Sequence, residues 1–336
     1  VSAPRFNLNP LSLPALSLPD ALRKRSDLGP LKAEIKIAVP DGPVRFDAVR
    51  IQAGRPDLIA AVLNGRVADV ENLQGVDAHL TVRGNELHRI TNLVGQSIPV
   101  QGPFELDTDI KTPAAGRVHF QKMAATLGPN RFSADVLIDT RPPRPKLTAA
   151  LDIKKLDLRS VASKDPEGAF LQEHFSSAVL EDRLIFPSYS APDWLMENDA
   201  DIEFNLDQFS ISRFTIQALK GHFQLQNGDI RLRAEGDSFA DIEDVSRISG
   251  RFEIGRTELQ VRAAADKQKL AVQAIQLHAG NPETVELNLE GTVADAVRQR
   301  GLDVRFVLNG DDSDILNNFL ALPKPLEGPF RFSGHL

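Results

Sequence analysis

Seven histidines and two acidic clusters are the residues of this chain best suited to chemistry. Histidine is the usual general base and a common metal ligand, and carboxylates suit a hard cation such as calcium. One acidic cluster directly precedes an expected helix, where acidic residues cap the first turn, and the other alternates along an expected strand on its solvent face. The clusters are Asp311, Asp312 and Asp314, and Glu197, Asp199 and Asp201. We expect neither to bind a metal.

No motif of a known catalytic or cofactor site accompanies these residues. The sequence has no phosphate-binding loop, dinucleotide fingerprint, nucleophile elbow, HExxH motif or EF-hand spacing. It also has no cysteine, which excludes disulfides, thiolate metal sites and a cysteine nucleophile. The sequence therefore predicts a protein that is not an enzyme and that has no cofactor and no metal site.

The chain repeats itself at an offset of 226 residues from Gly29 to its end. Residues 54–84 match residues 280–310, and the glycines coincide throughout, as Gly54 with Gly280. The histidines do not coincide, since His79 corresponds to Arg305 and His278 to Gln52. A repeat that keeps turn glycines and apolar alternation but exchanges its polar groups indicates a long uniform surface and argues against an active site.

Period-2 alternation of apolar residues from Gly29 onward predicts a mainly β protein, with strands that bury one face. Turn residues separate the strands, as antiparallel meanders require. We take the apolar members of these rows as candidate lipid-contacting residues of a groove, on the assumption that their polar alternates point outward. They are Ile35, Ile37, Leu80, Val82, Phe104, Leu106, Phe132, Val136, Ile138, Leu147, Leu151, Phe204, Leu206, Leu232, Val261, Leu287 and Phe306. Ala149 lies in the same row as Leu147 and Leu151 but is not claimed as a contact, because position 149 holds an alanine and not a leucine.

Four blocks describe the expected organisation. They are an extended leading segment over 1–28, a first repeat block over 29–175, a divergent middle block of the same groove over 176–250, and a truncated second copy over 251–336. A weaker repeat, with an offset of 73 residues, relates Gly29 to Gly102. Short helices are expected at residues 19–24, 85–94, 165–175 and 313–320. Both ends of the sequence suggest a piece of a longer polypeptide, with any membrane anchor outside it.

The expected apolar face must be covered by something, and a few short helices cannot cover so many strands. The sheet either packs onto itself as a sandwich or curls into a trough that a ligand fills, and periodicity does not separate the two. Each acyl methylene removed from water contributes about 0.8 kcal/mol, so a two-chain lipid would gain on the order of 20 kcal/mol in a trough. The aromatic residues, 18 Phe with one Tyr and one Trp, suit apolar contacts. The net charge of −7 predicts no binding to nucleic acid.

An ordered series of motifs resembles the AsmA family of Gram-negative envelope proteins. The series is GNELHRITNLVG, SIPVQGPFELDTDI and MAATLGPNRFSADVLIDTRPPRPKLTAALDIKKLDL, within residues 82–158. Its beginning recurs in NGDDSDILNNFLALPKPLEGPFRFSGHL, and DRLIFPSYSAPDWLMENDADIEF resembles the family's linker into its following strands. The chain departs from the pattern at Ala134, where a glycine is common.

The resemblance implies a repeating β-groove with a taco-like trough. It also implies a periplasmic location with an inner-membrane anchor, and transport of phospholipids or other acyl-chain lipids that supports outer-membrane lipid homeostasis. The alternative is a periplasmic scaffold that binds other proteins and assists outer-membrane protein assembly by offering strand edges.

Overall fold

The computed structural model describes residues 2–3, 29–39, 42–55, 59–85, 102–128, 130–157, 193–211, 214–242, 250–266, 269–281, 283–296, 298, 300–311, 313 and 327–336. They form two compact units, residues 1–141 and 142–336, that we describe separately. The expected helices at 19–24, 165–175 and 313–320 lie outside the described residues, apart from Ser313, and so does the one at 85–94, apart from Asn85.

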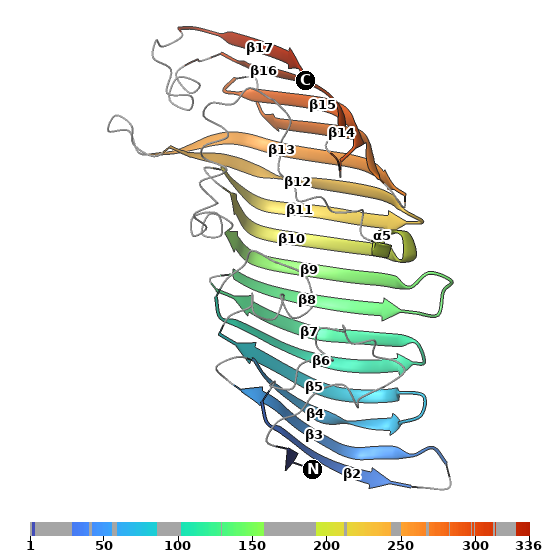
Figure 1. Ribbon diagram of the computed structural model, residues 1–336. Coiled ribbons are helices and arrows are strands. Elements are labelled where there is room, and N and C mark those ends of the chain that lie inside the picture. Colours follow the sequence, from blue (N-terminus) through green and yellow to red (C-terminus); the bar gives the residue numbers. More distant parts are fainter. Residues whose placement is uncertain are drawn as a thin grey trace. The chain divides into compact units, whose positions relative to one another are not determined.

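Unit 1 is an antiparallel meander in which each strand pairs with the next (Figure 1). A two-residue strand, β1 (Ser2–Ala3), pairs with β2. The others are β2 (Leu31–Ala38), β3 (Arg45–Arg55), β4 (Ile59–Asp69), β5 (Gln74–Gly84), β6 (Phe104–Ala114), β7 (Arg117–Leu127) and β8 (Asn130–Asp139).

Unit 2 begins with a parallel pair and continues as a second antiparallel meander. Its elements are β9 (Lys146–Asp157), α5 (Asp193–Glu197), β10 (Asp199–Ile211), β11 (Phe214–Gln226), β12 (Asp229–Ile242), β13 (Gly250–Ala265), β14 (Leu270–Gly280), β15 (Glu286–Asp295), β16 (Arg300–Gly310) and β17 (Phe330–His335). The sequence pattern predicts antiparallel pairing only, so the parallel β9–β10 pair differs from the expectation. The long connection between β9 and β10 explains the difference, because parallel neighbours need a crossover of a dozen residues or more.

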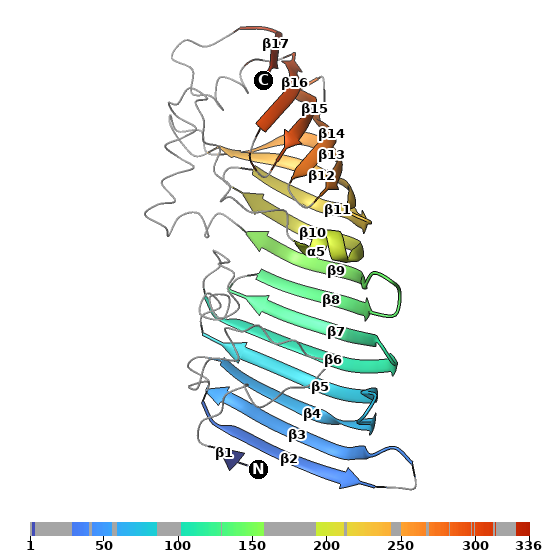
Figure 2. The same ribbon diagram turned by 45° about the vertical axis from the view of Figure 1, so that its right-hand side comes forward.

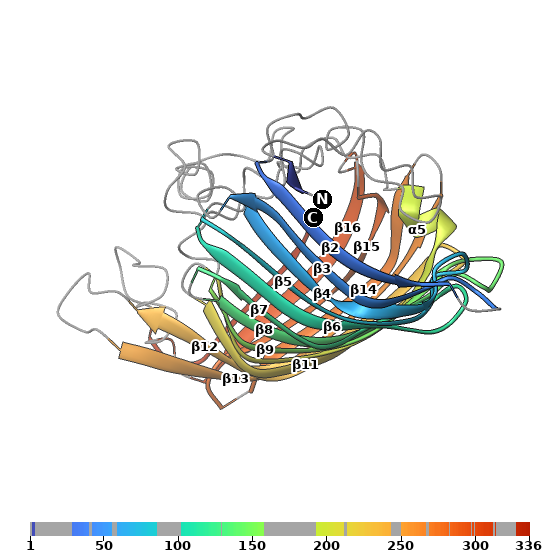
Figure 3. The same ribbon diagram turned by 90° about the horizontal axis from the view of Figure 1, so that it is seen from below.

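The expectation of a mainly β protein built from a curled antiparallel sheet is confirmed. In each unit the strands bend along their length and the sheet stays open (Figure 3). β-Bulges contribute to the bend, because an extra residue on one strand kinks it and increases its twist. Register shifts mark bulges at Phe46/Val49 and Phe120/Met123 in unit 1, and at Gln217/Lys220 and Val272/Ile275 in unit 2.

The 226-residue offset is visible in the strands and turns of the two units. It carries β4 and β5 onto β15 and β16 within a residue at each end. Gly54 and Gly280 both have positive φ, 86° and 95°, and a Cβ at either would collide with a carbonyl oxygen, that of Ile59 or Val285. Because no other residue fits such a position, the pattern keeps glycine there in both copies.

A cluster of buried apolar side chains lies under α5. Figure 2 shows this helix beside the beginning of β10. Leu195 of α5, Ala200, Leu225 and Ala265 are buried there, and Met196, Ile202 and Phe223 pack around them. No helix in the described part of the chain is long and apolar enough to cross a bilayer.

Candidate functional site: the apolar face

Strand register places the candidate groove residues of unit 1 on one face of its sheet. Directly paired residues point to the same side, so the register connects Ile35 with Val49, Gly65, Ala78, Ile110, Phe120 and Val136. A second row connects Val82 with Leu106, Ala125 and Phe132. Ile37, Leu80, Phe104 and Ile138 share this face, since each lies two residues from a member of these rows. We call it the apolar face of unit 1.

The corresponding face of unit 2 is equally continuous. One row runs through Leu151, Phe204, Gly221, Ala234, Leu259, Leu277, Leu289 and Phe306. A second runs through Ala149, Ile202, Phe223, Leu232, Val261 and Ile275. Leu147, Leu206 and Leu287 share this face, which we call the apolar face of unit 2.

Side chains on these faces are seldom fully enclosed. Leu206 is buried, Ile35 and Ile37 are 44% and 58% exposed, and the other candidate groove residues are half-buried. Large apolar side chains left at this exposure along whole rows are unusual for a self-packed core and are typical of an interaction surface.

Position 149 differs from the candidate groove residues on either side of it. Residue 149 is an alanine between Leu147 and Leu151 in the row. Ala149 is only 7% exposed and is directly paired with Ile202 of β10. Its single methyl group shares the apolar face with Leu147 and Leu151 but offers almost no accessible surface to a ligand.

Helix α5 covers one part of the apolar face of unit 2. Leu147, one of the candidate groove residues, packs against the buried cluster around Leu195, whereas Leu151 lies four residues further along β9. The structure therefore separates two residues that the alternation treats alike.

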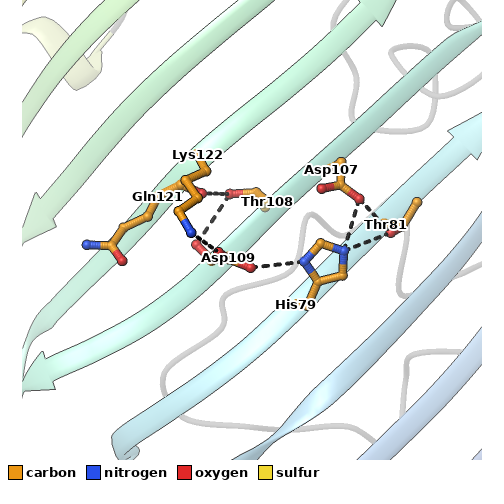
Figure 4. A network of polar contacts seen from close by, with 7 residues as sticks. All are labelled: His79, Thr81, Asp107, Thr108, Asp109, Gln121 and Lys122. Atoms are coloured by element: carbon orange, nitrogen blue, oxygen red, sulfur yellow. Dashed lines mark hydrogen bonds and ion pairs between the residues drawn. The ribbon is translucent and has the colours of Figure 1, made fainter.

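One polar side chain on the apolar face of unit 1 is internally satisfied. Thr108 is 1% exposed, and its hydroxyl donates to the carbonyl oxygen of Gln121 at 3.2 Å across the bulge of β7 (Figure 4). Because this hydroxyl is bonded, its presence does not make the surface polar.

The opposite face of each sheet carries cross-strand ion pairs. Every described histidine pairs there with a carboxylate of a neighbouring strand or of its own hairpin. The pairs are His79 with Asp107 and Asp109 (both 3.0 Å), His119 with Asp135 (2.6 Å), His222 with Asp201 (2.6 Å), His278 with Glu286 (3.7 Å) and His335 with Asp303 (2.7 Å). Glu105, Asp107 and Asp109 therefore lie on the polar face, as their alternation with Phe104 and Leu106 predicts.

The network around His79 is the most connected of these pairs (Figure 4). Thr81 donates its hydroxyl to Asp107 at 3.0 Å, and Lys122 lies 3.7 Å from Asp109. The hydrogen bond with Asp109 raises the pKa of His79 and lowers that of Asp109. The network is solvent-accessible and holds the imidazole between two carboxylates, an arrangement that ties strands together.

Two of the six acidic residues in the two clusters, Asp199 and Asp201, bind other side chains or backbone groups of the protein. Asp199 accepts from Arg144 Nε and from the backbone N–H of Asn227, both at 3.0 Å, and Asp201 binds His222. Glu197 belongs to α5 and not to the strand expected there. The described residues contain no group of three or more His, Cys, Asp or Glu side chains that could hold a metal ion, while Asp312 and Asp314 lie outside them.

Strict period-2 alternation in the sequence does not identify every residue of the apolar faces. Val49, Phe120, Met123, Phe223 and Ile275 belong to them by register. All five residues lie in bulged strands, where residues of one face are three apart and not two at the bulge. A search that tolerates one inserted residue within an alternating row would find them.

Comparison of the chain with protein-family models, with curated proteins and with solved structures gives no significant match.

Proposed function

We propose that this protein is a non-enzymatic carrier of acyl-chain lipids, which move along the apolar faces of its curled sheets. The observation that carries the proposal is the register. It aligns Ile, Leu, Val and Phe side chains, most of them half-buried, in rows that cross β2–β8 in unit 1 and β9–β16 in unit 2, with glycine or alanine at some of the intervening positions.

The chemistry of such a face matches hydrocarbon and little else. It offers mainly methyl, methylene and phenyl groups in continuous rows. Polar side chains on these faces, such as Thr108 in unit 1 and Ser210 and Thr215 in unit 2, are buried and hydrogen-bonded within the sheet. A sugar, a nucleotide or a peptide would lose hydrogen bonds to water there without replacement. An acyl chain loses none, and each methylene it buries contributes about 0.8 kcal/mol.

The order of motifs that resembles the AsmA family supports a specific setting for this activity. On that resemblance, we propose that the protein works in the periplasm of a Gram-negative cell, attached to the inner membrane, and carries phospholipid that supports the outer membrane. The curled open sheet agrees with the β-groove of that family.

Native mass spectrometry of the purified chain tests the proposal. We expect adducts with the masses of two-chain phospholipids, released when the complex is activated in the gas phase. A chain purified from a phospholipid-rich extract without any such adduct, and unable to take up a phospholipid from vesicles, would contradict it. Recovery of outer-membrane proteins without lipid would favour the scaffold alternative.

A further inference from the structure

Helix α5 occupies the same face that the proposed function assigns to acyl chains. Leu195 is 7% exposed, and with Ala200, Leu225 and Ala265 it forms a buried cluster at the strand ends. Met196 also packs on this cluster, and its sulfur would lie 3.2 Å from a Cβ at Gly228, in the turn between β11 and β12. The helix thus covers the first positions of β9 and β10 and the last positions of β11.

A polar clamp holds the residues that follow the helix. Arg144 donates to the carbonyl oxygen of Asn198 at 3.1 Å and to Asp199 at 3.0 Å. Asp199 also accepts from the backbone of Asn227, and this bond is the main reason that its pKa is lowered. Side chains of the ion pair are about a quarter exposed, 26% for Arg144 and 24% for Asp199. These bonds, which we call the clamp, connect the residues after α5 with Arg144, just before β9, and with Asn227, in the turn between β11 and β12.

The covered part of the face ends within one strand. Leu147 on β9 packs against the cluster, and Leu151 lies four residues later, about 13 Å away at the usual rise of a strand. Beside them on β10, Ile202 packs against the cluster and pairs with the buried Ala149, whereas Phe204 pairs with Leu151.

We infer that α5 is a built-in stop that replaces lipid at one margin of the apolar face of unit 2. This inference rests on the proposed function. Acyl chains contact Leu151, Phe204 and the rows beyond them. Leu195 covers Leu147, Ala200 and Leu225, which therefore do not contact lipid. The helix therefore sets the point along β9 and β10 beyond which an acyl chain cannot extend.

Photolabelling of the unmodified chain tests the inference. Vesicles of phosphatidylethanolamine carry a phosphatidylcholine with a diazirine near the end of one acyl chain, and labelled peptides are mapped by mass spectrometry after irradiation. We expect label at Leu151 and Phe204 and none at Leu147, Ala200 or Leu225. In the Leu195→Asp variant, whose helix no longer fits the cluster, label extends to Leu147 and Ala200.

Two further variants keep the test decisive. Glu197→Gln changes an exposed residue of the same helix and keeps the unmodified labelling pattern. Arg144→Gln opens the clamp without altering the cluster, and shifts label towards Leu147 even if Leu195→Asp proves unable to fold, as judged by circular dichroism.

The outcomes separate the inference from the proposed function. Label at Leu147 and Ala200 of the unmodified chain overturns the stop and leaves lipid carriage standing. A labelling pattern unchanged by both Leu195→Asp and Arg144→Gln also overturns the stop. Absence of label from the whole apolar face of both units overturns the proposed function.

Discussion

The phenyl ring of Phe204 lies over Gly221, its directly paired neighbour on β11, so closely that a Cβ at residue 221 would collide with the ring. The far end of the ring therefore lies over the backbone of the neighbouring strand. Phe306 lies in the same way over Gly334 of β17. At both places the paired residue is a glycine, so the aromatic ring can cover the backbone of the neighbouring strand. The apolar face therefore stays continuous from one strand to the next.

Replacing Gly221 with alanine should displace the ring of Phe204. Overpacking of this kind usually costs about 1–3 kcal/mol, and the urea midpoint of Gly221→Ala should fall accordingly. In a Phe204→Ala background the same methyl group meets no ring, so most of this loss should disappear. Equal losses in the two backgrounds would contradict the contact, because a double-mutant cycle reports the interaction between neighbours.

Gly280 and Gly328 allow backbone strain to be separated from collision within unit 2. Both have positive φ, 95° and 81°, but only a Cβ at Gly280 would collide with a carbonyl oxygen, that of Val285. A non-glycine residue in such a conformation costs about 1–3 kcal/mol. Gly280→Ala should therefore destabilise the chain more than Gly328→Ala in urea unfolding, and the reverse order would refute the geometry of the β14–β15 turn.

Asp139 connects the ends of β7 and β8 through two arginines. It accepts from Arg117 Nε at 2.8 Å and from Arg141 Nη2 at 2.7 Å, and its side chain is 13% exposed. These bonds, that with Arg141 foremost, hold the pKa of the carboxyl well below its usual range. Asp139→Asn should lower the urea midpoint more than Asp135→Asn, a change on the same strand to a carboxylate that is 55% exposed.

The contribution of Asp139 should depend on pH in one direction. Because its pKa is lowered on folding from 3.8, the stabilisation is complete above about pH 4–5 and is lost as the pH falls through the folded value. Wild type and Asp139→Asn should therefore differ by a constant amount from neutral pH down to about pH 5, and converge only in stronger acid. Convergence near neutral pH would contradict the assigned cause.

His79 should stabilise unit 1 most at mildly acidic pH. Asp109 raises its pKa above 6.5, so its contribution is fully present below about pH 6.5 and is lost as the pH rises through the folded value. The benefit falls again only in stronger acid, below the ordinary carboxyl pKa of 3.8, as the pH drops through the lowered pKa of Asp109. His79→Gln should lower the urea midpoint at about pH 5.5 and have little effect at about pH 9. Since His79 is half-exposed, the effect is small, and it should vanish in an Asp107→Asn, Asp109→Asn background.

Alternation in the sequence was sufficient to predict several strands whose backbone is regular, although it missed the regular strand β4. The rows at Val76–Val82, Leu147–Ile153 and Val304–Phe306–Leu308 correspond to β5, β9 and β16. Strands β3, β7, β11 and β14 produce no such row, and each contains a bulge. An inserted residue shifts the alternation by one position, so Phe120 and Met123 share a face although they are three residues apart.

The role of α5 could not be predicted from the sequence. Five residues are too few to show a helical period, and an isolated helix of this length is unstable in water. Its stability comes from tertiary contacts, since Leu195 is buried against Leu225 and Ala265, which are distant in sequence. Alternation likewise could not distinguish Leu147 from Leu151, because it identifies a face and not what covers that face.

A charge on the apolar face of β6 should block lipid passage, whereas a charge change on its polar face should not. Leu106 pairs with Val82 and Ala125 in the middle of the apolar rows, and the adjacent Glu105 is exposed on the opposite face. An unpaired carboxylate beside acyl chains costs several kcal/mol, so Leu106→Asp should abolish transfer of a fluorescent phospholipid between vesicles, as should Phe104→Asp. Glu105→Lys, on the same strand, should retain the wild-type rate. If both faces respond alike while circular dichroism shows a folded sheet, lipid does not travel along the apolar face of unit 1.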